Sequence, residues 1–239
     1  MTYDGHELTR SYIVTNIRRG IPYVNPNLEL VGDRGRYAFL GSQLVPPTIS
    51  FTILAGEMDV TRRREAIREL APILLVDRFV RVSFSSDDGR YYMAIPQGEI
   101  PFQEFVRSGR LDVTMTCDSA AMYGRQMGVT VPSGGSVTFN VGGNDATRPR
   151  LKASAAVRDG SSGVWGIRLD GADVIKVPLA SSSSRAIEID CESRTCKVAG
   201  VTALPTLDSD WMELGVGRHT LTNHLGSGQC VVTWDERWV

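Results

Sequence analysis

The strongest constraint in this chain is that short alternating strand patterns occupy most of its 239 residues, and only one stretch shows helical spacing. Alternation with a period of two is typical of strands that bury one face. It is clearest at residues 48–53, where Ile49, Phe51 and Ile53 share a face. Six further sets alternate in the same way: Val80/Val82/Phe84, Leu111/Val113/Met115, Val137/Phe139/Val141, Trp165/Ile167/Leu169, Ile187/Ile189 and Cys230/Val232/Trp234. We therefore predict a mainly β fold.

The exception is an arginine-rich helix near residues 60–72. Ile67, Leu70, Ala71 and Leu74 recur at i, i+3, i+4 and i+7, which places one apolar stripe on a helix. Asp59 or Thr61 can serve as the N-cap. Pro72 lacks an amide hydrogen and disfavours helix before it, so we expect this single short helix to end or kink near Leu70 or Ala71.

Turn-forming residues divide the pattern. Asp88-Gly89 predicts a hairpin turn between Val80–Phe84 and Tyr91–Ile95. Residues 123–136 (YGRQMGVTVPSGGS) show no sustained period, and we interpret them as a domain boundary or linker. The prediction is an N-terminal β domain at 1–130, with one short helix laid across a sheet, and a β-sandwich of jelly-roll type at 131–239. Ser181–Ser184 is interpreted as a surface loop.

Bulk properties exclude several classes. The net charge of −1 offers no global attraction for nucleic acid or an anionic membrane. The polar N-terminus lacks the layout of a signal peptide, and the longest apolar run, residues 71–76, is far too short to span a bilayer. We therefore expect synthesis and assembly in a cytoplasm. Four cysteines are too few for a disulfide scaffold at this length.

No motif for nucleophilic, phosphate-binding or metal chemistry is present, so no catalytic, cofactor-binding or metal-ligating residue is predicted. His219 and His224, with Cys230 nearby, are the only candidate metal group. Their five-residue separation puts the two histidines on opposite faces of a continuous strand, which argues against a shared ion. Asp87 and Asp88 are interpreted as turn residues rather than an acid–base pair.

Cys191 and Cys196 flank a possible four-residue hairpin loop, which would place them opposite each other and within reach of a disulfide. The alternative, which we favour, is two small buried side chains in a reducing cytoplasm.

Two groups of surface candidates remain open. Arg62, Arg63, Arg64 and Arg68 form either a solvated helix face, which is favoured, or a contact to phosphate or to an acidic partner surface. Trp165 and Trp234 lie in register with apolar neighbours and favour core packing, whereas Trp211 and Trp238 are less certain. Exposed tryptophans would suit a carbohydrate-binding module that recognises cell-wall glycans, which is the alternative function. A jelly-roll glycoside hydrolase with two catalytic carboxylates is a third possibility. The sequence contains acidic residues but no recognisable catalytic arrangement of them.

The order and spacing of several stretches point to a family. They include GDRGRYAFLGSQLVPPTISFTI, TRRREAIRELAPIL, DDGRYYMAIP and LDVTMTCDSAAMYG in the N-terminal half. In the C-terminal half they include FNVGGNDATRPRLK, AIEID with CESRTCKVAG, ELGVGRHTL and VTWDERW. Together these stretches resemble the distal tail protein (Dit) family of siphophages over essentially the whole chain.

The resemblance implies a non-enzymatic structural protein of the virion tail tip, without a cofactor. It implies an N-terminal β-sandwich domain that carries one short helix and forms a homo-hexameric ring, and a C-terminal galectin-like β-sandwich. The expected partners are the major tail tube protein and the tail hub or tail-associated lysin, with DNA passing through the ring unbound. The chain has no room for an inserted carbohydrate-binding module, so an adaptor role is favoured. The irregular segment Val24–Arg36, rich in turn formers, is expected to be either an arm that reaches an adjacent subunit or a loop within its own domain.

Overall fold

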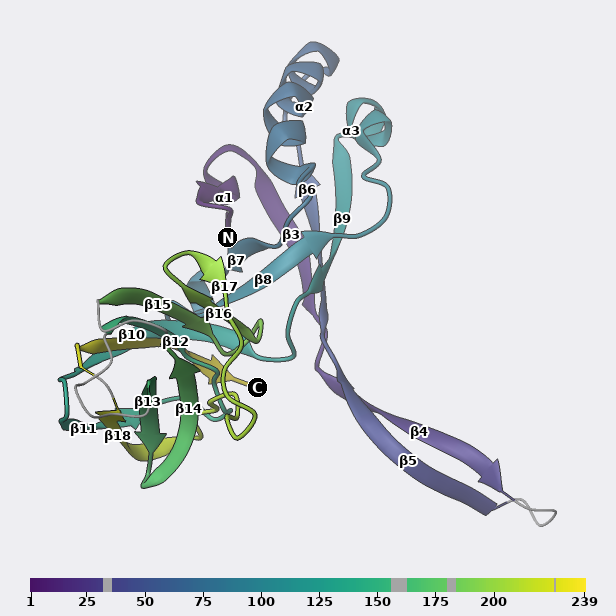
Figure 1. The fold of residues 1–239 in the computed structure, drawn as a ribbon. Helices are drawn as coiled ribbons and strands as arrows, with labels where there is room; N and C mark the ends of the chain where they lie inside the picture. The colour runs from purple at the N-terminus through teal and green to yellow at the C-terminus, as the bar shows by residue number, and fades with distance from the viewer. Residues whose placement is uncertain (32–35, 156–162, 180–183, 226) are drawn as a thin grey trace. The chain divides into compact units, whose positions relative to one another are not determined.

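The computed structural model describes residues 1–31, 36–155, 163–179, 184–225 and 227–239. Within it the chain forms two compact units, Met1–Tyr123 with Val239, and Gly124–Trp238 (Figure 1). The predicted domains, 1–130 and 131–239, place the boundary seven residues later (130 − 123). Most of the loop predicted at Ser181–Ser184 lies outside the described residues.

Residues 123–136 were predicted to be a domain boundary or a linker. The division between the two units does fall there, after Tyr123, but the linker alternative is wrong for most of the segment because Met122–Val131 form strand β10. Two glycines broke the apparent period there, and both are needed for close packing. A Cβ at Gly124 would lie 2.9 Å from Nε1 of Trp238, and one at Gly128 would lie 3.2 Å from Cγ2 of Thr233. Glycine in a strand often marks such a close approach rather than a break.

The N-terminal unit is built on seven strands that hydrogen-bond in the order β2-β1-β7-β8-β9-β6-β3. Their alternating residues produce the core, since Ile49, Phe51 and Ile53 are buried as predicted. The mainly β prediction is confirmed. The strands are β1 (Thr2–Tyr3), β2 (His6–Glu7), β3 (Ile13–Arg19), β6 (Thr48–Leu54), β7 (Val80–Ser83), β8 (Tyr91–Pro96) and β9 (Arg110–Cys117).

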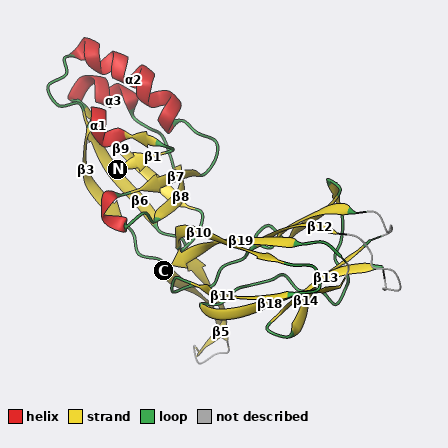
Figure 2. Cartoon of the chain, turned by 90° about the vertical axis from the view of Figure 1, so that its left-hand side faces the viewer, coloured by secondary structure: helices red, strands yellow, loops and turns green. Residues whose placement is uncertain are grey.

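Three α-helices belong to this unit where the sequence predicts one: α1 (Leu8–Ser11), α2 (Val60–Leu74) and α3 (Phe102–Ser108) (Figure 2). The predicted end of α2 near Leu70 is wrong. The helix continues through Pro72, and the amide of Leu75 still donates to the carbonyl of Ala71 at 2.8 Å. The ring costs one intrahelical bond, while the turn that follows buries Leu74 completely.

The capping residues of these helices explain why α2 could be predicted from the sequence and α3 could not. Asp59 is the N-cap of α2, and its side chain accepts from the amide of Arg62 at 2.8 Å, as one of the two predicted caps requires. Helix α3 follows Pro101 without a side-chain cap and buries only Phe105 among its seven residues. A helix this short, with one buried residue and no cap, leaves almost no periodic signal.

The C-terminal unit is a sandwich of two sheets, as predicted (Figure 2). One sheet has the order β17-β16-β15-β12-β19-β10, and the other has the order β11-β18-β13-β14. Trp165, Ile167, Val232 and Trp234 lie in the shared core. The strands are β11 (Ser136–Val141), β12 (Arg150–Ala155), β13 (Val164–Leu169), β14 (Ala172–Pro178), β15 (Arg185–Asp190), β16 (Thr195–Val198), β17 (Val201–Thr202), β18 (Gly217–Leu225) and β19 (Cys230–Trp238).

Candidate assembly surface

The segment expected to be irregular is instead regular β structure. Tyr23–Val31 form β4 and Arg36–Val45 form β5, and these strands pair antiparallel as a two-stranded sheet of their own (Figure 1). We call residues 23–45 the arm. Pro26, which made the segment look like a loop, is tolerated because both strands are edge strands.

The arm has one apolar and one polar face, and a β-bulge keeps them separate. Val24 pairs with Leu44, and Leu28 pairs with Phe39, with a register shift between Asn27 and Leu28. The extra residue lies on β5 next to Gly41, whose φ is +133°. Without this shift, strict alternation along β5 would place Phe39 opposite in face to Leu44. We call the resulting set the apolar face: Val24, Pro26, Leu28, Tyr37, Phe39 and Leu44.

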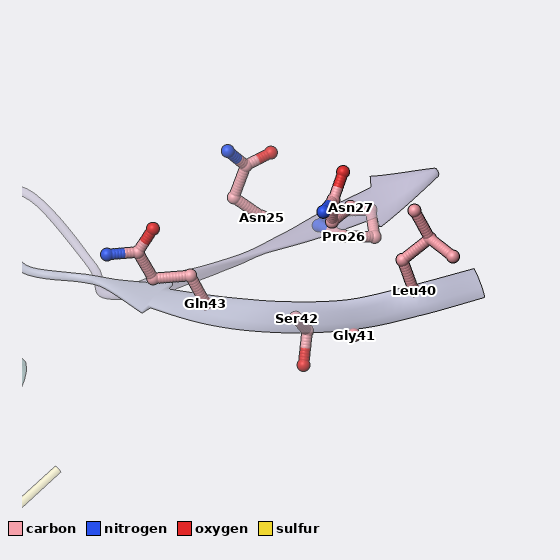
Figure 3. A pocket seen from close by; sticks show the side chains of 7 residues that line it. All are labelled: Asn25, Pro26, Asn27, Leu40, Gly41, Ser42 and Gln43. Atoms are coloured by element: carbon pink, nitrogen blue, oxygen red, sulfur yellow. The ribbon is translucent and has the colours of Figure 1, made fainter. Parts of the chain in front are cut away.

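The opposite face is polar and uncharged over its central part. Asn25, Asn27 and Gln43 point to one side of the ribbon together with Leu40, while Ser42 points to the other (Figure 3). These residues line a shallow open hollow. Amide, hydroxyl and aliphatic side chains line it, and none of them titrates near neutral pH, so these residues offer no acid–base chemistry.

The apolar face lies open to solvent. Tyr37 is 69% exposed and Phe39 is 65% exposed. Five of the nineteen exposed large hydrophobic residues in the described chain lie on this face: Val24, Leu28, Tyr37, Phe39 and Leu44. An isolated two-stranded hairpin is marginally stable in water, and a contiguous exposed apolar patch is typical of an interaction site.

Strand β3 offers a second unused surface in the same unit. Among the described strands it pairs only with β6, so its other edge is free. Ile13 and Ile17 on this strand are 57% and 41% exposed. Arg19, at its end, forms an ion pair with the buried carboxylate of Asp87, and its Nη1 lies 2.6 and 2.7 Å from the two carboxylate oxygens.

The polar clusters of the C-terminal unit hold loops in place. Nδ1 of His219 lies 2.7 Å from Oδ2 of Asp170, and Nε2 lies 2.8 Å from the carbonyl oxygen of Gly215. Burial alone lowers the pKa of His219, but the bonds to Asp170 and Gly215 outweigh it, so the net pKa is raised. Both partners are acceptors, and only the protonated ring donates to both.

Comparison with known proteins finds one matching family and similar solved structures. Residues 142–238 match the family described as the siphovirus-type tail component, C-terminal domain. The whole chain superposes on the SPP1 Dit protein with a TM-score of 0.70 at 17% identity, covering 100% of this chain and 98% of that one. The C-terminal part of the chain therefore matches this tail-component family, and the chain as a whole shares the fold of the SPP1 Dit protein.

A second structure is less similar: the phage P2 baseplate in its activated, calcium-containing conformation gives a TM-score of 0.48 at 11% identity over 92% of this chain and 90% of that one. The SPP1 protein is described as a paradigm of the hub adsorption apparatus in phages that infect Gram-positive bacteria. A search of curated protein sequences finds no match to this chain.

The structure separates the two candidate metal histidines. His219 contacts Asp170, whereas Nε2 of His224 lies 3.1 Å from Oδ1 of Asp173. Burial and the neighbouring Arg168 lower the pKa of His224. In the described part of the chain, no three His, Cys, Asp or Glu side chains gather as a metal site would require.

The predicted pairing of Cys191 with Cys196 is wrong in register. Cys196 lies opposite Ile189, and Asp190 lies opposite Thr195, so Cys191 falls in the turn. Asp190 accepts from the amides of Glu192 and Ser193, which holds that turn. Both thiols are free and buried, as the favoured alternative predicts. Burial raises the pKa of Cys191 to about 12, which leaves it without thiolate character at neutral pH.

The tryptophan predictions for the core are confirmed, since Trp165 and Trp234 are fully or almost fully buried. They are unavailable to stack on sugars. Trp211 is half-buried and packs against the same core. Trp238 is also half-buried.

The arginines of the predicted cluster on α2 fall into two groups. Arg62, Arg64 and Arg68 are exposed, as a solvated helix face requires. Arg63 turns inward, and its Nη1 lies 3.3 Å from the carbonyl oxygen of Arg107, near the C-terminal end of α3. A cation is favoured at that end of a helix, and only the position of α3 reveals this role.

Asp87 and Asp88 have different structural roles. Asp88 adopts φ of +48°, as a turn residue does, which confirms that interpretation. Asp87 is buried against Arg19, a role that the sequence did not reveal because the two residues lie 68 positions apart.

No helix among the described residues has both the length and the apolar character to cross a membrane.

Proposed function

We propose that the chain is the ring-forming adaptor at the distal end of a siphophage tail. Six copies form a closed ring that joins the major tail tube protein to the tail hub or tail-associated lysin. DNA passes through the ring without being bound. The protein is structural rather than catalytic, and it assembles in the cytoplasm of the host bacterium.

The observation that carries this proposal is the extent of the likeness to the SPP1 Dit protein, which covers nearly all of both chains. A hub protein of the adsorption apparatus is the role described for that relative. The match of residues 142–238 to a siphovirus-type tail component supports the coarser statement that this chain is a structural component of a phage tail.

The surfaces of the N-terminal unit support a role in assembly. The described residues offer an exposed apolar face on the arm and a free edge on β3, while the thiol groups of Cys117, Cys191 and Cys230 have pKa values raised to about 12 by burial. Surfaces of that kind bind other protein chains, whereas reactive thiols need lowered pKa values.

Light scattering on the purified chain, with negative-stain imaging of the main peak, tests the ring. Six copies of 26.2 kDa have a mass of about 157 kDa. We expect that mass and closed six-fold rings. A 26 kDa species at every concentration, which also stays monomeric when mixed with the tail tube protein, would contradict the proposal.

A further inference from the structure

We propose that the free edge of β11 binds an extended segment of a different protein by β-strand addition. The segment that fits this edge carries apolar side chains at alternate positions and no charge where it pairs. The inference goes beyond the proposed ring, because the site lies within the C-terminal unit. Only the choice of a different protein as the occupant rests on the ring.

Strand β11 is an outer strand of the four-stranded sheet in the C-terminal unit (Figure 1). Among the described strands it pairs only with β18, through consecutive antiparallel pairs without a register shift. Its sequence, Ser-Val-Thr-Phe-Asn-Val, contains no charged residue, no proline and no glycine. A regular edge strand of this composition is a template for another strand, because it lacks the devices by which proteins block such pairing.

The direction of the backbone groups shows how much of this edge is available. The amide of Asn223 on β18 donates to the carbonyl oxygen of Gly135, next to β11, at 3.0 Å. Hydrogen-bonded pairs recur at every second residue of an antiparallel ladder, so the odd-numbered residues of β11 bond to β18. The backbone groups of the even-numbered residues therefore point to the free edge. These residues, Ser136, Thr138 and Asn140, are all exposed.

The opposite edge of the same sheet, on β14, is covered by the loop at residues 206–210. The amide of Thr206 donates to the carbonyl oxygen of Lys176 at 2.9 Å. The amide of Asp210 donates to the carbonyl oxygen of Val174 at 2.7 Å. Between them, the amide of Lys176 donates to the hydroxyl oxygen of Ser209 at 2.9 Å. The chain thus saturates one edge of this sheet by itself and leaves the β11 edge open.

The core-facing side chains beside the free edge are incompletely covered. Val137 and Phe139 pack against the core of the sandwich, and the ring of Phe139 lies 4.8 Å from that of Trp234 between centroids. Both residues remain partly exposed. Leu221, which pairs with Val137 from β18, is completely buried. An added strand with apolar residues on the core side would cover this gap, and strand addition takes its specificity from such alternate side chains.

The choice of occupant follows from symmetry. Pairing of β11 with β11 of a second copy is isologous and stops at two copies. The proposed ring needs a contact that continues from copy to copy, which such pairing does not give. Every copy in the ring therefore keeps an open edge for a segment of another protein. Main-chain hydrogen bonds supply the affinity in this mode of binding, and β11 offers no charge that would select a charged segment.

The probe is a synthetic peptide with the sequence of β18, GRHTLTNHL, because this is the strand with which β11 already pairs. N-methylation of its odd-numbered amides (numbered as in the chain) leaves only the edge that bonds to β11 with both leucines toward the core. The control peptide carries the same number of methyl groups on the even-numbered amides, so it can pair only with its leucines turned away. By isothermal titration calorimetry on the full-length chain, we expect the control to bind at least about tenfold more weakly.

Substitutions on β11 test the edge from the side of the protein. Thr138→Pro removes an amide at the free edge and no bond of the fold, and proline is tolerated at such positions. We expect it to weaken binding of the probe at least about tenfold. Thr138→Val keeps the amide and should leave the affinity unchanged. Asn140→Lys, which adds a blocking charge without altering the backbone, is a second variant, and circular dichroism confirms that each is folded.

Hydrogen exchange reads the edge directly. The amides of Ser136, Thr138 and Asn140 should exchange fast in the free chain and slowly with the probe bound. The amides of Val137 and Phe139 should be protected in both states, because they bond to β18. Protection of the even-numbered amides in the free chain would show that the edge is already covered and would overturn the proposal.

The remaining outcomes separate this site from the ring. Failure of the probe to bind, equal binding of the two peptides, or binding that survives both Thr138→Pro and Asn140→Lys overturns the site. A mass that falls by half in Thr138→Pro identifies a second copy as the occupant and overturns the choice of a different protein. A monomeric wild-type chain that still binds the probe overturns the ring and leaves the β11 edge standing.

Discussion

The arm and the C-terminal sandwich are built from the same kind of strand and differ in what covers the apolar side. In the sandwich, Trp165 on β13 and Val232 on β19 lie between two sheets and are fully buried. In the arm, Phe39 and Leu28 line up on one face of a single two-stranded sheet and remain exposed. Alternation therefore predicts that a strand has an apolar face. It does not predict whether that face is buried within the chain or against another one.

The largest expected effect is in the buried core of the C-terminal sandwich. Trp165→Ala removes a fully buried side chain, and large-to-small changes at such aromatics cost about 3–5 kcal/mol. We expect the free energy of unfolding of the C-terminal unit to fall by that amount. Chemical denaturation followed by tryptophan fluorescence measures it, because all four tryptophans lie within residues 165–238.

A loss below about 1 kcal/mol there would show that the core relaxes around the cavity. The contrast between covered and uncovered faces would then be weaker than the burial values indicate.

The Arg19–Asp87 ion pair allows the effect of a buried contact on stability to be tested in the N-terminal unit. Arg19→Met leaves the carboxylate of Asp87, which is 7% exposed, without its cationic partner. We expect a loss of about 1–3 kcal/mol, the usual penalty for a buried group left unsatisfied. Circular dichroism at 222 nm follows this unit, since the α-helices of the described chain all lie within it.

Arg18→Met is the matched control for that prediction. Arg18 is the exposed neighbour on the same strand, and its replacement should change stability by less than about 0.5 kcal/mol. Equal losses in both variants would show that charge on β3, rather than the ion pair, stabilises the unit.

We expect a smaller effect on stability at the N-cap of α2, in the same unit. Asp59→Ala removes the acceptor for the amide of Arg62 and should cost about 1 kcal/mol. Asp59→Asn, which caps comparably, should restore most of the loss. If the asparagine variant is as unstable as the alanine variant, the carboxylate charge matters more than the cap geometry.

The His219–Asp170 pair predicts a pH dependence of the C-terminal unit. Because the pKa of His219 is raised above its ordinary 6.5, its contribution is complete below that pH and is lost as the pH rises through the folded value. The pKa of Asp170 is lowered from 3.8, so its contribution is lost as the pH falls through its own folded value. We expect an effect of about 0.2–1 kcal/mol for this partly exposed pair.

Fluorescence-monitored unfolding between pH 5.5 and 9 compares wild type with His219→Gln. The difference between the two should shrink as the pH rises. His224, whose pKa is lowered, contributes the opposite slope near pH 6, and this contribution cancels in the comparison. A difference that is constant with pH would indicate that the histidine acts through packing on Phe139 alone.

The smallest expected effect on stability is at the exposed apolar face of the arm. Phe39→Ala in the isolated chain at low concentration should change the free energy of unfolding by less than about 0.5 kcal/mol, because the side chain is 65% exposed. The same denaturation experiment measures it. A loss comparable to that of Trp165→Ala would mean that the arm packs against its own chain, and the comparison would fail.

Much of the local structure was predictable from residues close together in sequence. The buried faces of β6, β7 and β9 follow from alternation, and the Asp59 cap of α2 follows from residue type. The errors occurred where a local rule competes with packing. Pro72 lies inside a helix that continues to a buried Leu74, and the glycines of β10 mark close contacts rather than a linker.

The candidate surface was only half predictable. Residues 24–36 were singled out as an arm or a loop, but Pro26 and the asparagines concealed the strands. The apolar face could not be found, because an observer counting alternate residues assigns Phe39 and Leu44 to opposite sides. The ion pair of Arg19 with Asp87 was equally hidden, since the partners are 68 residues apart.

The sequence by itself determined the mainly β class, the buried faces of most strands, the position of the long helix and the likeness to the Dit family. Those features depend on side-chain period and residue type within short windows. The tertiary structure alone decided the pairing of Cys196 with Ile189, the role of Arg63 at the end of α3 and the shared face of the arm. Each of these depends on strand register or on contact between distant segments, and a one-residue shift in register moves every side chain to the other face.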